Sequence, residues 1–230
     1  SLLSFLIRFG DLTEALDLIT QPHYQLDLTD QPELSLELLT ALANQGNPAT
    51  PITQILLKKG AALHLRGDAV PAVAVQADAE QLLLSYEQAG LKLRLFPQLV
   101  AKAAEWNALR SLELFKARGF KLHEADEEGN TPLHTAFSAY SLEAIQWLIA
   151  NHAAPNARNK QDQTPLDLLT TPTSRALLQG MSEREWVAAL KPTMPTNTEV
   201  SINTLYQLAN ASRYELVDAL LQTWPPHTIS

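Results

Sequence analysis

Histidine is the side chain most often used for acid–base catalysis and metal binding near neutral pH, and this chain contains six of them. Their spacing does not suit a metal ion, because no His-x-x-x-His or comparable ligand pair occurs. The chain has no cysteine, which excludes disulfides, thiolate zinc sites and cysteine nucleophiles. We therefore expect no catalytic residue, no metal site and no cofactor.

Glycines and acidic residues do not indicate a ligand site either. No G-x-G-x-x-G or G-x-x-x-x-G-K phosphate loop is present. The acidic run Asp126, Glu127 and Glu128 lacks the alternating oxygen ligands of a calcium loop, and it suits the solvated tip of a hairpin. The formal net charge is -8 and no cluster of Lys and Arg occurs, so nucleic acid is not expected as a partner.

The strongest pattern is Thr-Pro-Leu-His-Thr-Ala at residues 131–136, with Thr-Pro-Leu-Asp following 33 residues later at 164–167. Proline suits the first turn of a helix, where its missing N–H costs nothing, and the preceding threonine can cap free amides. Apolar residues at helical spacing, Ile145, Leu148 and Ile149, then predict a second helix. These residues predict a pair of helices that repeats along the chain.

This pattern resembles the ankyrin repeat, whose signature T-P-L-H-x-A recurs at a period of 33 residues. The best unit runs from Glu128 to Lys160, and weaker copies of its second helix end at Gly60, Gly90 and Gly119. The resemblance implies an all-α ankyrin-repeat solenoid. We expect about six to seven helix-turn-helix repeats with short hairpin loops, several of them degenerate.

The expected ankyrin region covers residues 1–180, with repeats at 1–33, 34–68, 69–96, 97–127, 128–160 and 161–180. The last of these closes early at Arg175–Leu178. Residues 181–200 are expected to form an inserted helix and loop, because Ser182 and Glu185 make a capping box before an apolar run. Residues 201–230 are expected to form a C-terminal ankyrin-like helix pair or cap.

The repeat accounts for most of the histidines. His134 is the histidine of the signature and can hydrogen-bond between turns. His64 and His123 share one equivalent position at the exit of the second helix, and His23 and His152 share another. His227 lies in the tail, so no histidine requires a catalytic explanation.

The resemblance implies a groove, formed by first helices and hairpin tips, that binds a protein partner, and it implies no enzyme activity. Aromatic residues on such a surface are frequent binding anchors. Packing between irregular repeats is the alternative for Phe9 and Trp106, whereas Tyr140 replaces the usual glycine. The candidate partner-binding residues are Trp106, Tyr140, Asp126, Glu127, Glu128 and Phe9.

Two functional classes remain open for this interaction module. It can be a dedicated inhibitor or immunity protein for a toxin or enzyme, for which an acidic surface suits a basic target. It can also be a scaffold or adaptor region of a larger protein whose catalytic part lies outside this chain. Residues 181–200 are too short to hold an enzyme site of their own. We expect a monomer when no partner is bound.

The source and compartment are expected from composition. Few lysines, many glutamines and degenerate repeats are typical of bacterial ankyrin proteins. No run reaches the roughly 18 apolar residues of a membrane span, and Arg8 interrupts the only stretch that could suggest a signal peptide. We expect a cytoplasmic protein, or a periplasmic or secreted one if a targeting segment precedes Ser1.

Overall fold

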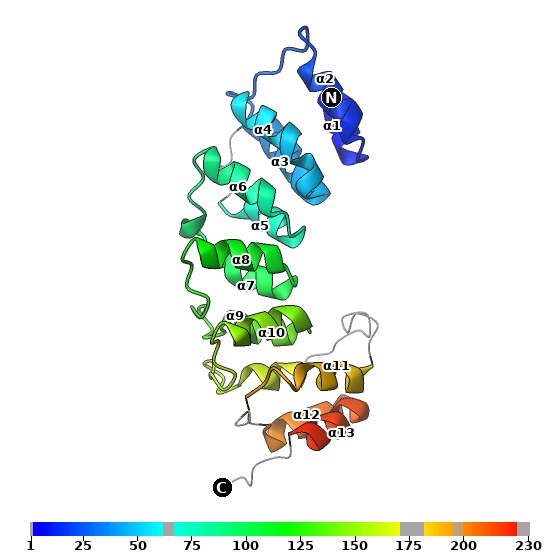
Figure 1. The fold of residues 1–230 in the computed structure, drawn as a ribbon, viewed down its shortest axis with the longest axis vertical. Coiled ribbons are helices and arrows are strands. Elements are labelled where there is room, and N and C mark those ends of the chain that lie inside the picture. Colours follow the sequence, from blue (N-terminus) through cyan, green and yellow to red (C-terminus); the bar gives the residue numbers. More distant parts are fainter. Residues whose placement is uncertain (1, 62–66, 171–181, 196–197, 199, 225–230) are drawn as a thin grey trace. The chain divides into compact units, whose positions relative to one another are not determined.

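A computed structural model describes residues 2–61, 67–170, 182–195, 198 and 200–224 (Figure 1). Every regular element in these ranges is a helix, so the predicted all-α class is confirmed. The chain divides into two compact units, one of Ser1–Leu99 with Arg110–Phe120 and one of Val100–Leu109 with Lys121–Ser230. The expected repeat end at Arg175–Leu178, His64 and His227 lie outside the described residues.

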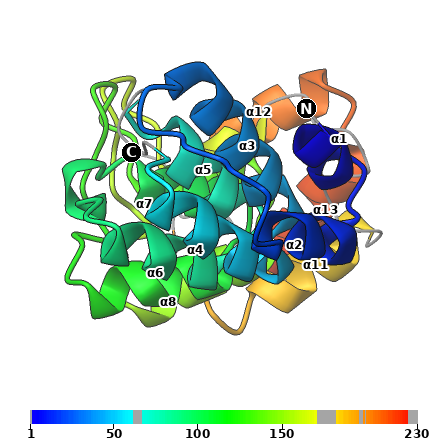
Figure 2. The ribbon, with the colours of Figure 1, turned by 90° about the horizontal axis from the view of Figure 1, so that it is seen from above.

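The first unit is built from three pairs of short helices and one further helix. They are α1 (Leu2–Arg8), α2 (Leu12–Thr20), α3 (Pro32–Gln45), α4 (Thr50–Lys58), α5 (Ala69–Gln76), α6 (Glu80–Gln88) and α8 (Leu109–Ala117), with the 3-10 turns η1 (Asn47–Ala49) and η2 (Leu93–Leu95). First helices α1, α3 and α5 pack in one row, and second helices α2, α4 and α6 in another (Figures 1 and 2). Neighbouring repeats thereby bury each other's apolar faces.

The second unit has the same kind of internal arrangement. It contains α7 (Leu99–Glu105), α9 (Pro132–Ser138), α10 (Leu142–Ala150), η3 (Pro165–Thr170), α11 (Glu183–Leu190), α12 (Ile202–Asn210) and α13 (Tyr214–Thr223). First-helix elements α9, η3 and α12 pack in one row, and α10, α11 and α13 in the other. The predicted C-terminal helix pair is therefore present as α12 and α13.

Helix α11 belongs to the row of second helices, although residues 181–200 were expected to be an insertion. Its buried face holds Trp186, Val187 and Leu190. The side-chain amide of Gln146 on α10 donates to the carbonyl oxygen of Ala189 at 2.9 Å. The predicted capping box of Ser182 is confirmed at its start. The sequence pattern identified the helix but not its neighbours. The distance from Thr164-Pro-Leu-Asp to α11 differs from the distance between the same two elements in the best repeat.

The last described helix pair has apolar side chains on its surface. Helices α12 and α13 carry four exposed large apolar side chains, Ile202, Tyr206, Tyr214 and Leu221. A terminal repeat usually has a polar outer surface. That this pair is a cap stays a prediction.

Three second helices, α6, α8 and α10, obtain an N-terminal cap from the repeat before them. Asp78, in the turn between α5 and α6, accepts hydrogen bonds from the backbone N–H of Arg110 at 3.2 Å and of Ser111 at 2.8 Å. Asn107 accepts from the N–H of Ala144 at 2.8 Å in the same way. The first amides of a helix have no partner within it, so these side chains satisfy them across the repeat boundary.

The capping side chains lie in turns with left-handed backbone. Asp78 and Asn107 have φ of 47° and 57°, in a region that favours glycine and tolerates Asn and Asp. Glycine does occur at the matching turns of the first two repeats, at Gly10 and Gly46. The unfavourable backbone conformation of Asp78 and Asn107 is thus offset by the hydrogen bonds that their side chains make to the next repeat.

We predict that Asp78→Gly lowers the free energy of unfolding by about 1–2 kcal/mol, because three hydrogen bonds to Arg110 and Ser111 are lost. Ser212→Gly is the matched control: Ser212 has φ of 59°, is exposed and caps no helix among the described residues. It should leave stability unchanged or slightly higher. Urea unfolding followed by circular dichroism compares them, and equal stability of the two variants would contradict the capping role.

Candidate functional site

The acidic hairpin tip at residues 126–130 is a closed, internally hydrogen-bonded loop. The Oδ1 atom of Asp126 accepts from the N–H of Glu128 at 3.0 Å and from the N–H of Asn130 at 2.7 Å. The N–H of Asp126 donates to the carbonyl oxygen of Asn130 at 2.9 Å. Short Asp and Asn side chains favour such turns because they can bond to backbone N–H groups ahead of them.

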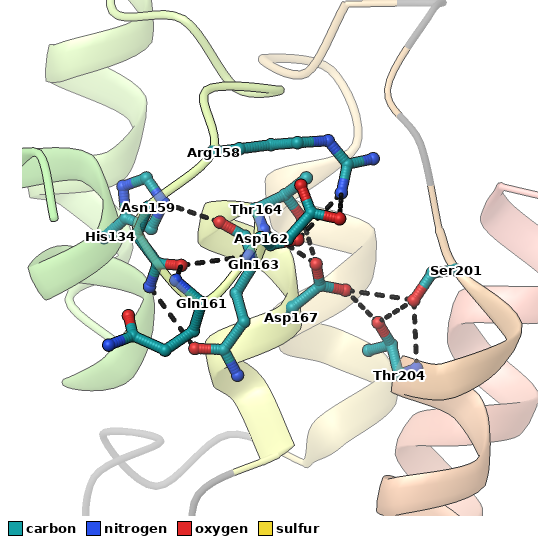
Figure 3. Close-up of polar contacts among 10 residues, drawn as sticks. All are labelled: His134, Arg158, Asn159, Gln161, Asp162, Gln163, Thr164, Asp167, Ser201 and Thr204. Atoms are coloured by element: carbon teal, nitrogen blue, oxygen red, sulfur yellow. Dashed lines mark hydrogen bonds and ion pairs between the residues drawn. The ribbon is translucent and has the colours of Figure 1, made fainter. Parts of the chain in front are cut away.

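The next tip, at residues 159–163, repeats this geometry 33 positions later (Figure 3). Asn159 Oδ1 accepts from the N–H of Gln161 at 3.0 Å and of Gln163 at 2.9 Å. The two tips are also joined, since Asn159 Nδ2 donates to Asn130 Oδ1 at 2.8 Å. The tips of these two repeats therefore form one connected polar surface.

This geometry separates the roles of the three acidic residues. The carboxylate of Asp126 accepts hydrogen bonds from the loop's own backbone. It is therefore less available to a protein partner than the carboxylates of Glu127 and Glu128. Glu127 and Glu128 are exposed, and no ion pair is found for either within the described ranges. Of the predicted acidic contacts, Glu127 and Glu128 are the ones that the fold leaves available.

The signature residues sit beneath the tips and connect successive first helices. The N–H of Thr131 donates to His134 Nδ1 at 3.1 Å, and His134 Nε2 lies 3.1 Å from the carbonyl oxygen of Gln163. Nδ1 therefore accepts and Nε2 carries the proton, which is the neutral imidazole. Burial lowers the pKa of His134 in agreement with this state. His134 has the structural role expected for it.

The sixth repeat replaces this histidine by Asp167 and makes the corresponding connections (Figure 3). Asp167 Oδ2 accepts from the N–H of Thr164 at 2.7 Å. Its Oδ1 accepts from the hydroxyls of Ser201 and Thr204 at the start of α12. The cluster of polar side chains in Figure 3 is thus explained by contacts between repeats.

The expectation that Tyr140 lines an exposed groove is wrong. Its side chain is fully buried, its ring centroid lies 5.3 Å from that of Trp186, and its hydroxyl donates to the carbonyl oxygen of Leu169 at 2.8 Å. The guanidinium carbon of Arg213 lies 5.6 Å from the ring centroid. Tyr140 accepts φ of 56° because these contacts with later repeats stabilise the ring.

Phe9 and Trp106 lie in solvent-accessible positions. Phe9 is 75% exposed. Trp106 is half-buried, and Lys102 Nζ lies 5.4 Å from its ring centroid, a cation–π contact. Their role in binding a partner stays a prediction.

Trp106 does not share a rim with the acidic tip. The tip directly precedes α9, whereas Trp106 directly follows α7. The two features therefore lie at opposite ends of the first helices, and a first helix of seven residues is roughly 10 Å long.

Sequence reasoning missed a second exposed aromatic residue beside Phe9. Phe5 is 56% exposed, and the ring centroids of Phe5 and Phe9 are 4.4 Å apart. The signal was available, because residues four apart lie on one helix face. It was missed because the apolar run at residues 2–7 was considered only as a signal peptide or as the first helix of a repeat.

Within the described residues, no three His, Asp or Glu side chains are grouped so that they could hold a metal ion, and no helix is long and apolar enough to cross a membrane.

Comparison with known proteins places the similarity in the middle of the chain. Residues 121–169 match the family model "Ankyrin repeats (many copies)". A stretch of 66 residues is 32% identical to human transient receptor potential cation channel subfamily A member 1, covering 29% of this chain and 6% of that protein. A stretch of 58 residues is 41% identical to the BTB/POZ domain and ankyrin repeat-containing protein NBCL of Lupinus angustifolius, covering 25% of this chain and 12% of that protein.

Two solved structures resemble this chain in fold over nearly its whole length. The human ASB11 ankyrin repeat domain superposes with a TM-score of 0.67 at 16% identity, covering 99% of this chain and all of that one. The ankyrin repeat domain of Bcl-3 gives 0.51 at 18% identity, covering 90% and 97%. The predicted ankyrin-repeat fold is confirmed. Both identities are low, so these structures establish the fold alone.

We predict that His134 makes stability depend on pH. Burial lowers its folded pKa below the ordinary value of 6.5, so the unfolded chain binds the proton more readily and stability falls as pH drops below about 6.5. Urea unfolding from about pH 7.5 to about 5.5 should show a decline that is smaller in His134→Gln than in the native chain. A parallel pH dependence of the two proteins would show that His134 does not titrate between folded and unfolded states.

Proposed function

We propose that this chain, which has an ankyrin-repeat fold, binds a basic protein partner through the hairpin tips of its second unit. The observation that carries the proposal is the tip at residues 126–130, which is ordered by its own hydrogen bonds and presents Glu127 and Glu128 to solvent. A surface that is ordered before binding loses less conformational entropy when a partner docks.

The charge of the tip favours a basic partner. Carboxylates without a counter-charge attract cations at long range and raise the association rate. The backbone N–H of Lys160 donates to the carbonyl oxygen of Glu128 at 2.9 Å, so the neighbouring tip fixes the backbone that carries these side chains. The net charge of -8 agrees with the same preference.

Trp106 supplies a candidate apolar contact at the other end of the first helices. Half-buried tryptophans on a surface are frequent anchors in protein interfaces. Lys102 covers one side of the ring, and its flexible side chain can move aside when a partner contacts the indole. Tyr140 is excluded from this role because it is buried.

Two roles are compatible with such a binding module, and the comparisons favour one. The chain spans 6% and 12% of the length of the two curated relatives described above. Repeats of this kind thus occur as parts of larger proteins, which supports a scaffold or adaptor region over a dedicated inhibitor or immunity protein. The length of the native polypeptide and the genes beside it distinguish these roles.

We predict that Glu127→Lys and Glu128→Lys each slow association with the protein partner that co-purifies from the native source. The expected decrease in association rate is about tenfold at low salt and smaller at high salt, because screening weakens steering. Asp17→Lys makes the same charge change on exposed α2 and is the control. Association rates that are equal in all four proteins would exclude the tip as the steering surface.

We predict that Trp106→Ala mainly accelerates dissociation of the same partner, with a loss of at least ~1 kcal/mol in binding. Tyr206→Ala removes an aromatic side chain that is 62% exposed and should not change the affinity. Surface plasmon resonance on folded variants measures both rates. An unchanged dissociation rate for Trp106→Ala assigns the indole to packing between repeats.

A further inference from the structure

The first unit contains a groove that the proposed function does not use. It has a volume of about 520 Å³ and lies where Arg8 of α1 meets one face of α3. The lining residues of α3 run from Glu33 to Gln45 at intervals of one, three or four positions, so they form a single helix face. At 1.5 Å per residue this face is roughly 18 Å long, the length of about five or six residues of extended chain.

An exposed aromatic pair flanks Arg8, the residue of α1 that lines this groove. Phe5 and Phe9 are one helical turn apart and lie on either side of Arg8 in the sequence. Arg8 is three residues after Phe5, so their side chains are neighbours on the helix surface. The two rings contact each other at 4.4 Å between centroids and remain 56% and 75% exposed. A contacting, solvent-exposed pair of this kind, with the ring planes tilted by 39°, offers an apolar surface to a partner.

The charges of the groove favour a cation. Arg8 and Glu37 form an ion pair at 3.0 Å, with side chains 63% and 41% exposed. Exposed pairs contribute at most about 1 kcal/mol, so a partner's cation can replace Arg8 at little cost. Glu33 is exposed and has no ion pair or side-chain hydrogen bond in the part of the chain that the structure describes.

The far end of the groove offers polar groups to a peptide backbone. The amide nitrogen of Asn44 donates to the carbonyl oxygen of Thr40 at 3.1 Å, and no hydrogen bond to its amide oxygen is found in the described residues. Asn44 is exposed. An extended segment has unpaired N–H groups that such an oxygen can accept.

We propose that this groove binds an extended, basic segment of a protein partner. An Arg or Lys of the segment pairs with Glu33 and Glu37, and an adjacent large apolar side chain packs on Phe5 and Phe9. This inference specifies which kind of protein segment the chain binds, and it rests on the proposed protein-binding function. A second copy of this chain carries the same net charge of -8, which disfavours it as the occupant, and an acidic segment would be repelled by Glu33.

The test starts from peptides, so that it does not depend on the natural partner. A random-peptide library displayed on phage is selected against the intact chain, and the selected peptides are synthesised and titrated by fluorescence polarisation. We expect them to contain Arg or Lys beside a large apolar residue. Replacing that basic residue by Glu should abolish binding.

Variants of the groove then locate the peptide. Phe9→Ala should weaken binding by about tenfold or more, as expected for an aromatic anchor, and Glu33→Gln by about fivefold. Arg8→Gln should instead tighten binding several-fold, because it releases Glu37 from its present cation. Asp17→Asn and Tyr214→Ala, matched changes at other exposed sites, should leave affinity within about twofold.

Three results overturn the proposal. In the first, the selection yields no binder or only neutral and acidic peptides. In the second, the peptide affinities do not change in the groove variants. In the third, light scattering shows a dimer of this chain that Phe9→Ala dissociates. Circular dichroism of each variant shows that it is folded. Loss of partner binding in the tip variants leaves these peptide results unaffected, so failure of the proposed function and failure of the groove are distinguishable.

Discussion

The structure depends on hydrogen bonds that one repeat donates or accepts across its boundary with the next. Helix α10 begins without a side-chain cap of its own and is capped by Asn107 of the preceding repeat. Helix α6 likewise lacks its own cap, and Asn47 accepts from the N–H of Gln81 at 3.0 Å. A repeat on its own would leave these amides unpaired as well as its apolar face exposed. Neighbouring repeats within each unit therefore stabilise each other.

The hydrogen bonds that hold the repeats together also decide which polar side chains remain available for binding. At the tips, Asp126 and Asn159 are occupied by backbone N–H groups, and beneath them His134 and Asp167 connect first helices. Side chains between these positions, such as Glu127 and Glu128, have no structural partner that constrains their type. Binding specificity can change at these positions without disturbing the fold.

The positions of individual side chains were harder to predict than the repeats. Tyr140 replaces a glycine, which suggested a functional surface residue, but later repeats supply Leu169 and Trp186 to enclose it. Helix α11 was predicted at the correct residues, yet its place between α10 and α13 could not be inferred from its capping box. In both cases the missing information was a contact with a segment far away in the sequence. For Phe5 the missing information was local, since its spacing of four residues from Phe9 places both exposed rings on one helix face.

The sequence by itself determined the helix pairs, the Thr-Pro-Leu-His turn and the all-α repeat fold, because proline, threonine and periodic leucines act over a few residues. It also placed the acidic tip at a turn. Only the tertiary structure decided that Asp126 is committed to the tip while Glu127 and Glu128 are exposed, that Tyr140 is buried, and that Arg8 meets α3 beside Phe5 and Phe9. Exposure depends on what neighbouring repeats cover, and local propensity does not specify those neighbours.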